Sequence, residues 1–191
     1  MMVQNFCYKT FIRKGWKFIN NVPQDLKSFV LIGAPHTSNY DFFAAMAIAG
    51  FMKKNARFVI KNEWVKFPFS LVMKPLGAYG LDRDRIKASQ GLNTTDLMAD
   101  LFVKEKDLVL MITPEGTRRS NNRWKTGFYY VAEKAQVPIV LGFADYSKKV
   151  LGLGMVIYPH DFNSDMKAIM DFYRSIKGKV PASFQLDSRF V

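Results

Sequence analysis

Residues 29–41 read FVLIGAPHTSNYD, an apolar run that leads into a histidine and an aspartate. The first six residues predict a buried strand, and the apolar run 42–49 predicts a following helix. On a regular helix, side chains five positions apart diverge by ~140°, so His36 and Asp41 cannot cooperate there. They can do so if His36 lies in a loop, which Pro35 favours, and Asp41 near the helix start. The carboxylate could then support His36 as a base; alternatively, Asp41 only caps the helix and His36 is a surface residue.

Along the rest of the chain, short apolar runs alternate with segments in which apolar residues recur at helical spacing. The runs predicted as strands are 57–60, 107–112, 138–144 and 150–158. Two predicted helices have their apolar residues at Leu97, Met98, Leu101 and Phe102, and at Phe128, Val131, Ala132 and Ala135. A last helix is predicted to begin at the N-cap Asn163 and to end before Gly178 and Pro181. Its apolar residues are Met166, Ile169, Met170, Tyr173 and Ile176. We therefore predict an α/β fold, a largely parallel sheet covered by helices. Its ligands are expected outside the carboxyl ends of the strands.

Size and charge narrow the class of protein. The 191 residues fit a single domain, 1–191, with an ordinary apolar share of 49%. The chain has 28 basic and 16 acidic residues, a formal net charge of +12. That balance points to acidic partners: nucleic acid, anionic lipid, a phosphorylated substrate or an acidic carrier protein. The single cysteine, Cys7, is assigned no role and fits a reducing compartment.

The N-terminal stretch 1–22 is predicted to contain an amphipathic helix. Basic residues fall on one face and apolar residues on the other: Lys9, Arg13, Lys14 and Lys17 against Cys7, Tyr8, Phe11, Ile12, Phe18 and Ile19. Such a helix lies either in a membrane interface or on the domain, and Gly15 weakens it. The longest uncharged apolar run, 42–52, has about half of the ~20 residues that span a bilayer. We expect neither a cleaved signal peptide nor a membrane-spanning segment.

A second polar segment, 113–119 with the sequence TPEGTRR, directly follows a predicted strand. It therefore lies at a strand's carboxyl end, where it could face His36. Gly116 permits a tight turn, Arg118 offers planar recognition of phosphate, and Lys125 could add a second positive charge. The alternative is a turn with an exposed salt bridge and a solvated lysine.

Three further positions are ambiguous. The segment 80–85, GLDRDR, either forms surface ion pairs or points Arg83 into the site. Lys61 follows the predicted strand 57–60 and could serve the same site. His160 is interpreted as a structural loop residue.

Together these segments resemble the glycerolipid acyltransferase family, whose type member is 1-acylglycerol-3-phosphate acyltransferase. Four of its motifs occur in order: the His-x4-Asp motif HTSNYD (36–41), the second block (80–83), EGTR (115–118) with the following WKTG (124–127), and VPI (137–139). The segment 61–69 also looks like the family's stretch between the first two blocks. The resemblance covers a motif-bearing core, 30–140, and implies an α/β domain with the histidine and aspartate in a cleft.

The resemblance also implies roles for individual residues. His36 is expected to be the general base, with Asp41 orienting it, so that an acceptor hydroxyl attacks the thioester of acyl-ACP or acyl-CoA directly. No metal and no bound cofactor are expected. The residues expected to hold the acceptor and its phosphate are Lys61, Arg83, Glu115, Gly116, Thr117, Arg118 and Lys125.

The expected acceptor is a lysophospholipid such as 1-acylglycerol-3-phosphate. Two departures from the family leave another lysolipid or an amino-acid-linked lipid open: Pro35 replaces a frequent asparagine, and the N-terminal anchor is reduced to residues 6–19. We expect a cytoplasmic enzyme, peripheral on the inner face of an anionic membrane.

Two other classes of function compete. A nucleic-acid-binding protein is favoured only by the net charge, because the basic residues are scattered and form no recognition module; nucleic acid is therefore not an expected partner. A hydrolase could use the same His36 and Asp41 on water.

Overall fold

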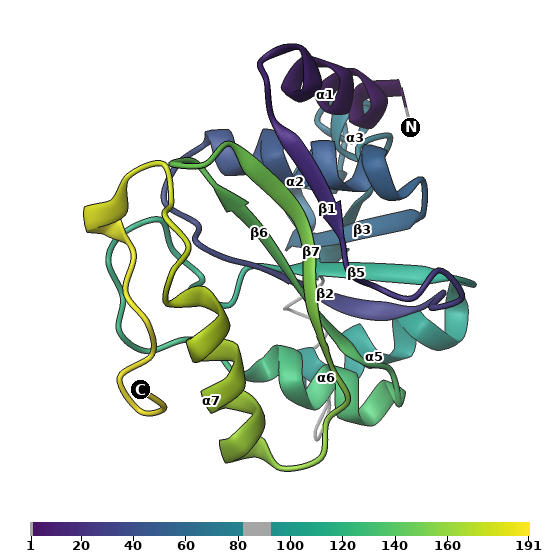
Figure 1. Cartoon of the computed structure of the whole chain (residues 1–191). Helices are drawn as coiled ribbons and strands as arrows, with labels where there is room; N and C mark the ends of the chain where they lie inside the picture. The colour runs from purple at the N-terminus through teal and green to yellow at the C-terminus, as the bar shows by residue number, and fades with distance from the viewer. Residues whose placement is uncertain (1, 82–92) are drawn as a thin grey trace.

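The computed structural model describes residues 2–81 and 93–191, and only the backbone of Lys61 and Leu81. In this part of the chain, the strands form one seven-stranded sheet in the order β1-β7-β6-β2-β5-β3-β4 (Figure 1). Neighbouring strands are parallel except for the pair β6 and β7. The strands are β1 (Lys17–Asn20), β2 (Phe29–Gly33), β3 (Asn55–Lys61), β4 (Ala78–Leu81), β5 (Leu108–Ile112), β6 (Ile139–Asp145) and β7 (Val150–Ile157). The predicted α/β fold with a largely parallel sheet is confirmed.

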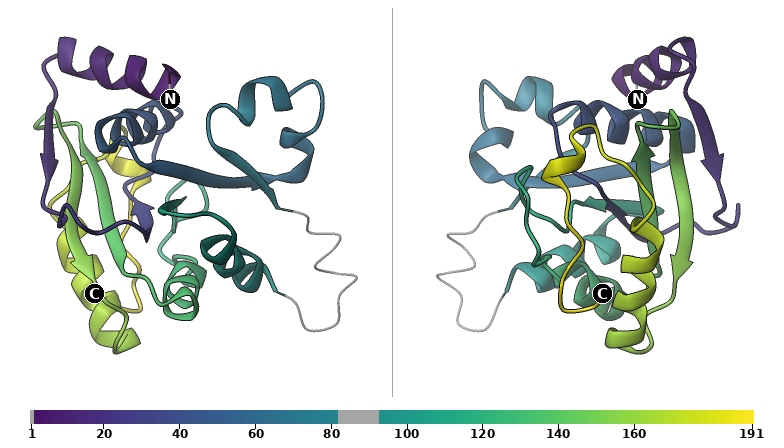
Figure 2. Two further views of the ribbon diagram at one scale, coloured as in Figure 1. Left: turned by 90° about the vertical axis from the view of Figure 1, so that its right-hand side faces the viewer. Right: turned by 60° about the vertical axis from the view of Figure 1, so that its left-hand side comes forward.

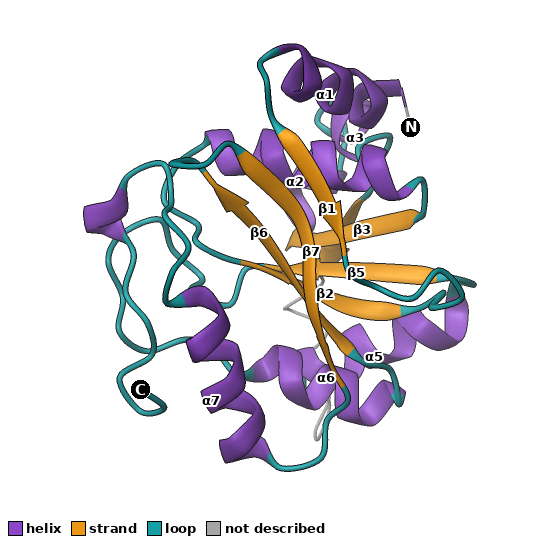
Figure 3. Cartoon of the chain, in the orientation of Figure 1, coloured by secondary structure: helices purple, strands orange, loops and turns teal. Residues whose placement is uncertain are grey.

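Helices cover both faces of the sheet (Figure 3). One layer contains α1 (Met2–Arg13) and α2 (Tyr40–Met52), and the other contains α5 (Thr94–Lys104), α6 (Gly127–Ala135) and α7 (Phe162–Tyr173). The short elements are η1 (Asn62–Val65), α3 (Ser70–Met73) and η2 (Pro181–Ser183). Over residues 2–81 and 93–191, no helix is both long enough and apolar enough to cross a membrane.

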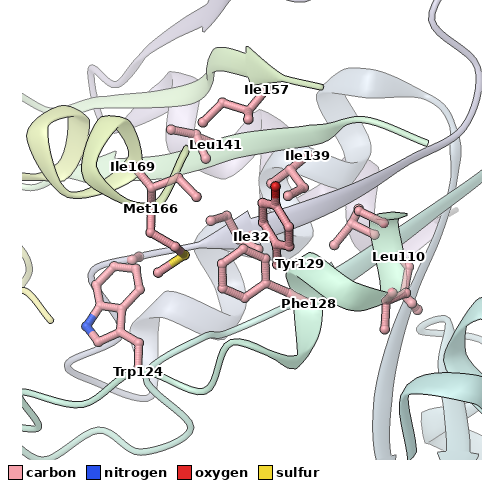
Figure 4. Packing of buried hydrophobic residues seen from close by; sticks show 14 of the residues in the cluster. Ile32, Leu110, Trp124, Phe128, Tyr129, Ile139, Leu141, Ile157, Met166 and Ile169 are labelled. Carbon is pink, nitrogen blue, oxygen red and sulfur yellow. The ribbon is translucent and has the colours of Figure 1, made fainter. Parts of the chain in front are cut away.

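Strand β2 lies between β6 and β5 and is buried on both faces, which explains its uninterrupted apolar sequence. Phe29 and Leu31 belong to the hydrophobic cluster that includes residues of α1 and α2. Val30 and Ile32 point the other way, into the cluster built from α5, α6 and α7 (Figure 4). Each fully buried side chain of this size contributes roughly 1.5–3 kcal/mol. This packing fixes the strand from which the histidine loop leaves.

The predicted N-terminal helix is too long. Helix α1 ends at Arg13, and Gly15, at a φ of 79°, turns the chain into strand β1. Lys17 and Phe18 are therefore strand residues, paired with Val150 and Leu151 of β7. The positive φ at Gly15 ends the helix, and the aromatic and β-branched residues that follow complete the edge of the sheet.

The start of the last helix is also shifted. Its N-cap is Asp161, whose side chain accepts a hydrogen bond from the backbone N–H of Ser164, and not Asn163 as predicted. Asparagine and aspartate are about equally good caps, so the sequence alone did not separate them. The helix ends at Tyr173, and Ile176 packs in the core from the segment beyond it.

Candidate active site

The site lies where the parallel strands β2 and β5 end side by side, with Ile32 opposite Ile112. The loop after β2 carries His36, and the loop after β5 carries the EGTR segment. The backbone N–H of His36 donates a hydrogen bond of 2.6 Å to Oε1 of Glu115. The two segments singled out in the sequence therefore contact each other directly.

His36 and Asp41 have the arrangement that their spacing requires. His36 lies in the loop, and Asp41 lies in the first turn of α2, where the helix dipole favours a negative charge. The Oδ2 atom of Asp41 accepts hydrogen bonds from the backbone N–H groups of Thr37, at 2.6 Å, and Ser38, at 2.7 Å. The Nδ1 atom of His36 lies 3.6 Å from the same oxygen. This contact is longer than an ordinary hydrogen bond, as is common in enzymes without bound substrate.

The other oxygen of Asp41 has a partner that the sequence did not predict. The hydroxyl of Tyr146, in the turn after β6, donates a hydrogen bond of 2.8 Å to Oδ1. Burial alone would raise the pKa of Asp41, but the contacts from His36, Tyr146, Ser38 and Thr37 outweigh it and hold the pKa below its usual range. Burial and the neighbouring carboxylate raise the pKa of Tyr146, so that its hydroxyl stays a donor.

Glu115 lies beneath the histidine loop and is 1% exposed. Burial raises its pKa to about 8; the His36 N–H opposes this shift, and the charge of Asp41 adds to it. Within the described residues its Oε2 atom has no hydrogen-bond partner. The carboxyl group thus contacts the backbone of the loop that carries His36.

Beside His36, an open pocket of ≈ 400 Å³ is lined by residues of the loop after β5, namely Thr113, Gly116, Thr117, Arg118 and Arg119. Gly116 has a φ of 65°, and a Cβ atom at this position would lie 2.8 Å from Cε of Lys125. The backbone N–H of Lys125 donates to the carbonyl of Pro114 at 2.8 Å. The fold therefore brings three cationic side chains, Arg118, Arg119 and Lys125, to the loop that borders the histidine.

Three further positions named in the sequence are Lys61, Arg83 and His160. Lys61 ends β3, which runs parallel to β5 on its other side, so its backbone reaches the same edge of the sheet. Arg83, with Asp82 and Arg85, lies outside the described residues. His160 is exposed before α7, and its backbone N–H donates to Asp165.

Three residues of the site were not singled out from the sequence. Thr113 and Arg119 line the pocket, and Tyr146 contacts Asp41. Each of them directly follows a strand or belongs to the segment 113–119, so position at a carboxyl end was the signal that could have found them.

A histidine supported by a carboxylate, at the carboxyl edge of an α/β sheet and beside an arginine-lined pocket, defines a class of protein. This arrangement is typical of an enzyme that removes a proton from a hydroxyl group or from water beside an anionic substrate. A model of the acyltransferase family matches residues 16–140, and the chain belongs to that family. The protein is an acyltransferase.

The fold is shared with a solved structure. The crystal structure of the 1-acyl-sn-glycerophosphate (LPA) acyltransferase PlsC from Thermotoga maritima superposes with a TM-score of 0.59. The two chains are 15% identical, and the match covers 90% of this chain and 75% of the other. At this identity the likeness shows a common fold.

Proposed function

We propose that this acyltransferase moves a fatty acyl group from the thioester of acyl-ACP or acyl-CoA to a hydroxyl of a lysophospholipid such as 1-acylglycerol-3-phosphate. The observation that carries the proposal is the supported His36 at the wall of the same pocket that Arg118 and Arg119 line. The name of the Thermotoga maritima neighbour, an LPA acyltransferase, supports the same acceptor.

In the proposed reaction, His36 is the general base. With Nδ1 turned toward Asp41, Nε2 takes the proton of the acceptor hydroxyl while the hydroxyl oxygen attacks the thioester carbonyl carbon. A new C–O bond forms, the C–S bond breaks, and the thiolate receives the proton from the imidazolium. The ionised Asp41 stabilises that imidazolium. Such a base is worth roughly 10²–10⁴-fold in rate.

The acceptor's phosphate is assigned to the cationic loop after β5. Arg118 and Arg119 line the pocket, and Lys125 packs over the same turn. Guanidinium groups bind phosphate oxygens in pairs. Thr117 adds a hydroxyl that already accepts a hydrogen bond from the backbone of Arg119. We keep Lys61 and Arg83 as proposed phosphate ligands on the motif resemblance, and assign buried Glu115 to holding the histidine loop.

We also propose that the enzyme works on an anionic membrane surface. Helix α1 packs on α2, yet exposes Met2, Val3 and Phe6 on its other side, next to the exposed Lys9. Segment 62–73 exposes further large apolar side chains: Trp64, Phe67, Phe69, Leu71 and Val72. Both lie at the same end of the molecule (Figures 1 and 2). Exposed apolar side chains on a protein with a net charge of +12 suit an interface of anionic lipid.

The test of the proposed reaction is product analysis. The purified protein is incubated with acyl-ACP or acyl-CoA and a panel of lysolipids, including 1-acylglycerol-3-phosphate and an amino-acid-linked lysolipid, and products are identified by mass spectrometry. We expect a diacyl product that forms only when donor and lysolipid are both present. Free fatty acid formed equally with and without lysolipid would identify a hydrolase and contradict the proposal.

A further inference from the structure

Tyr146 is held rigidly against the site by three elements of the fold. It follows β6, the neighbour of β2 in the sheet, so its ring lies at the carboxyl edge. Its backbone N–H donates to the carbonyl of Lys177 at 2.9 Å. The ring of Trp16, which precedes β1, meets the tyrosine ring edge to face at 5.1 Å. These contacts orient the ring, and its hydroxyl points at Asp41.

The two carboxylate oxygens of Asp41 have different partners. Oδ2 accepts from the backbone N–H groups of Thr37 and Ser38 and faces Nδ1 of His36. Oδ1 accepts the hydroxyl of Tyr146 at 2.8 Å, and its only other hydrogen bond within the described residues is a long one, 3.4 Å, from the Ser38 hydroxyl. Because a carboxylate rotates about its Cβ–Cγ bond, fixing Oδ1 also fixes the direction in which Oδ2 points.

We propose that Tyr146 is a positioning residue for acyl transfer, whose hydroxyl fixes the carboxylate plane of Asp41 so that Oδ2 stays aimed at Nδ1 of His36. The inference rests on the proposed roles of His36 and Asp41. Tyr146 lies 105 residues from Asp41 and outside the matched family region 16–140. Tyr146 is not among the residues that line the pocket, and its hydroxyl donates to Asp41, so its effect on the reaction is expected to act through Asp41.

Burial and the carboxylate of Asp41 keep the hydroxyl of Tyr146 a donor. Asp41 lies at the hydroxyl, and the Nζ atom of Lys179 lies 5.5 Å from the ring centroid and 4.6 Å from that of Tyr40. His36 and Glu115 affect the hydroxyl of Tyr146 indirectly, through their interactions with Asp41.

The test is a double-mutant cycle with Tyr146→Phe and Asp41→Asn, assayed for acyl transfer. Tyr146→Phe keeps the ring and its packing on Trp16, and removes only the hydroxyl. We expect kcat to fall about tenfold, the size of one hydrogen bond to a charged group, with the KM values of donor and acceptor unchanged. In the Asp41→Asn background, Tyr146→Phe should have no further effect. Tyr158→Phe, whose side chain is 65% exposed, is the matched control and should match the wild type.

A second measurement reads the contact without kinetics. Carboxyl ¹³C NMR should show a higher titration midpoint for Asp41 in Tyr146→Phe than in the wild type, because a donor to the ionised form is lost. In the wild type, the phenol of Tyr146 should stay protonated at a pH at which exposed tyrosines ionise. Titration of Tyr146 together with the exposed tyrosines overturns the inference even if the variant does not fold.

Other outcomes separate this inference from the proposed function. Wild-type kcat in Tyr146→Phe, or an equal loss in both backgrounds, overturns the role of Tyr146 while leaving His36 as the base. Full acyl transfer by His36→Ala overturns the proposed mechanism itself, whatever Tyr146→Phe does.

Discussion

Asp41 and Glu115 both contact the loop of His36, and their surroundings move their pKa values in opposite directions. Hydrogen bonds hold Asp41 ionised, although burial opposes it. Within residues 2–81 and 93–191, the Oε2 atom of Glu115 has no such contact, and burial raises the pKa of Glu115 to about 8. Two carboxyl groups at one site can thus have two protonation states. Asp41 is the one that can support a positive imidazolium.

The raised pKa of Glu115 predicts a pH dependence of stability. Its folded pKa of about 8 lies above the ordinary value of 4.5, so ionisation opposes folding. The stabilising contribution of the proton is complete below the ordinary value and is lost as the pH rises through about 8. Glu115→Gln cannot ionise, so its free energy of unfolding should fall less than that of the wild type between about pH 5 and about pH 9.

Chemical denaturation at several pH values measures this difference. Glu133→Gln, at an exposed position of α6, is the matched control. Its free energy of unfolding should change with pH as that of the wild type does. Equal slopes for the wild type and Glu115→Gln would show that Glu115 is ionised in the folded protein at neutral pH.

At the residue scale, the sequence predicted the pair and its loop-to-helix placement. The five-position spacing left one geometry in which His36 and Asp41 can meet, and the structure has it. The place of Tyr146 at a strand end could be predicted, but its hydrogen bond to Asp41 could not, because that contact depends on which strand lies next to β2. The burial of Glu115 has the same origin: it depends on how closely two loops pack.

At the scale of one element, the turn after β5 is shaped by Gly116. Its positive φ and the packing of Lys125 over it leave no room for a side chain. We predict that Gly116→Ala displaces Lys125, raises the KM for an anionic acceptor several-fold and lowers the free energy of unfolding by about 1 kcal/mol. Steady-state kinetics and urea denaturation measure the two effects.

The matched control for this turn is Gly127→Ala, at the first residue of α6. There the nearest atom lies 3.8 Å from an added Cβ, so kinetics and stability should stay close to the wild type. An unchanged KM in Gly116→Ala would show that the cationic turn does not bind the acceptor.

The elements themselves were predicted to different degrees. Strands β2 and β6 could be predicted from their long apolar runs, because both are buried on two faces. The edge strands β1 and β4 have only four residues each, too few for a period to be recognised. Gly15 was recognised as a weak point of the N-terminal helix, but its positive φ, which ends the helix, becomes visible only in the fold.

At the largest scale, two segments with exposed apolar side chains lie at one end of a strongly basic protein. The net charge of +12 and the exposed side chains of α1 and segment 62–73 predict binding to anionic vesicles. In a vesicle flotation assay, less of the double variant Phe6→Ser with Phe67→Ser than of the wild type should bind phosphatidylglycerol vesicles. Added salt should weaken binding further. Val103→Ser, 89% exposed on α5 in the other helix layer, is the matched control.

Flotation of the double variant equal to that of the wild type would show that this end does not contact lipid. Equal binding to neutral phosphatidylcholine vesicles would show that charge has no part in it. The composition predicts an acidic partner but not the surface that would bind it, because exposure is a property of the fold and not of the residue count.

The proposed reaction depends on His36, which takes the proton of the acceptor hydroxyl in a direct attack on the thioester. Single-turnover acyl transfer, at saturating donor and lysolipid, tests it in the wild type and in His36→Ala, with His160→Ala as the exposed-histidine control. We predict that His36→Ala remains folded by circular dichroism and loses roughly 10²–10⁴-fold in rate, while His160→Ala is unaffected. Wild-type rates in folded His36→Ala, or a covalent acyl-enzyme isolated during the turnover, would contradict the account.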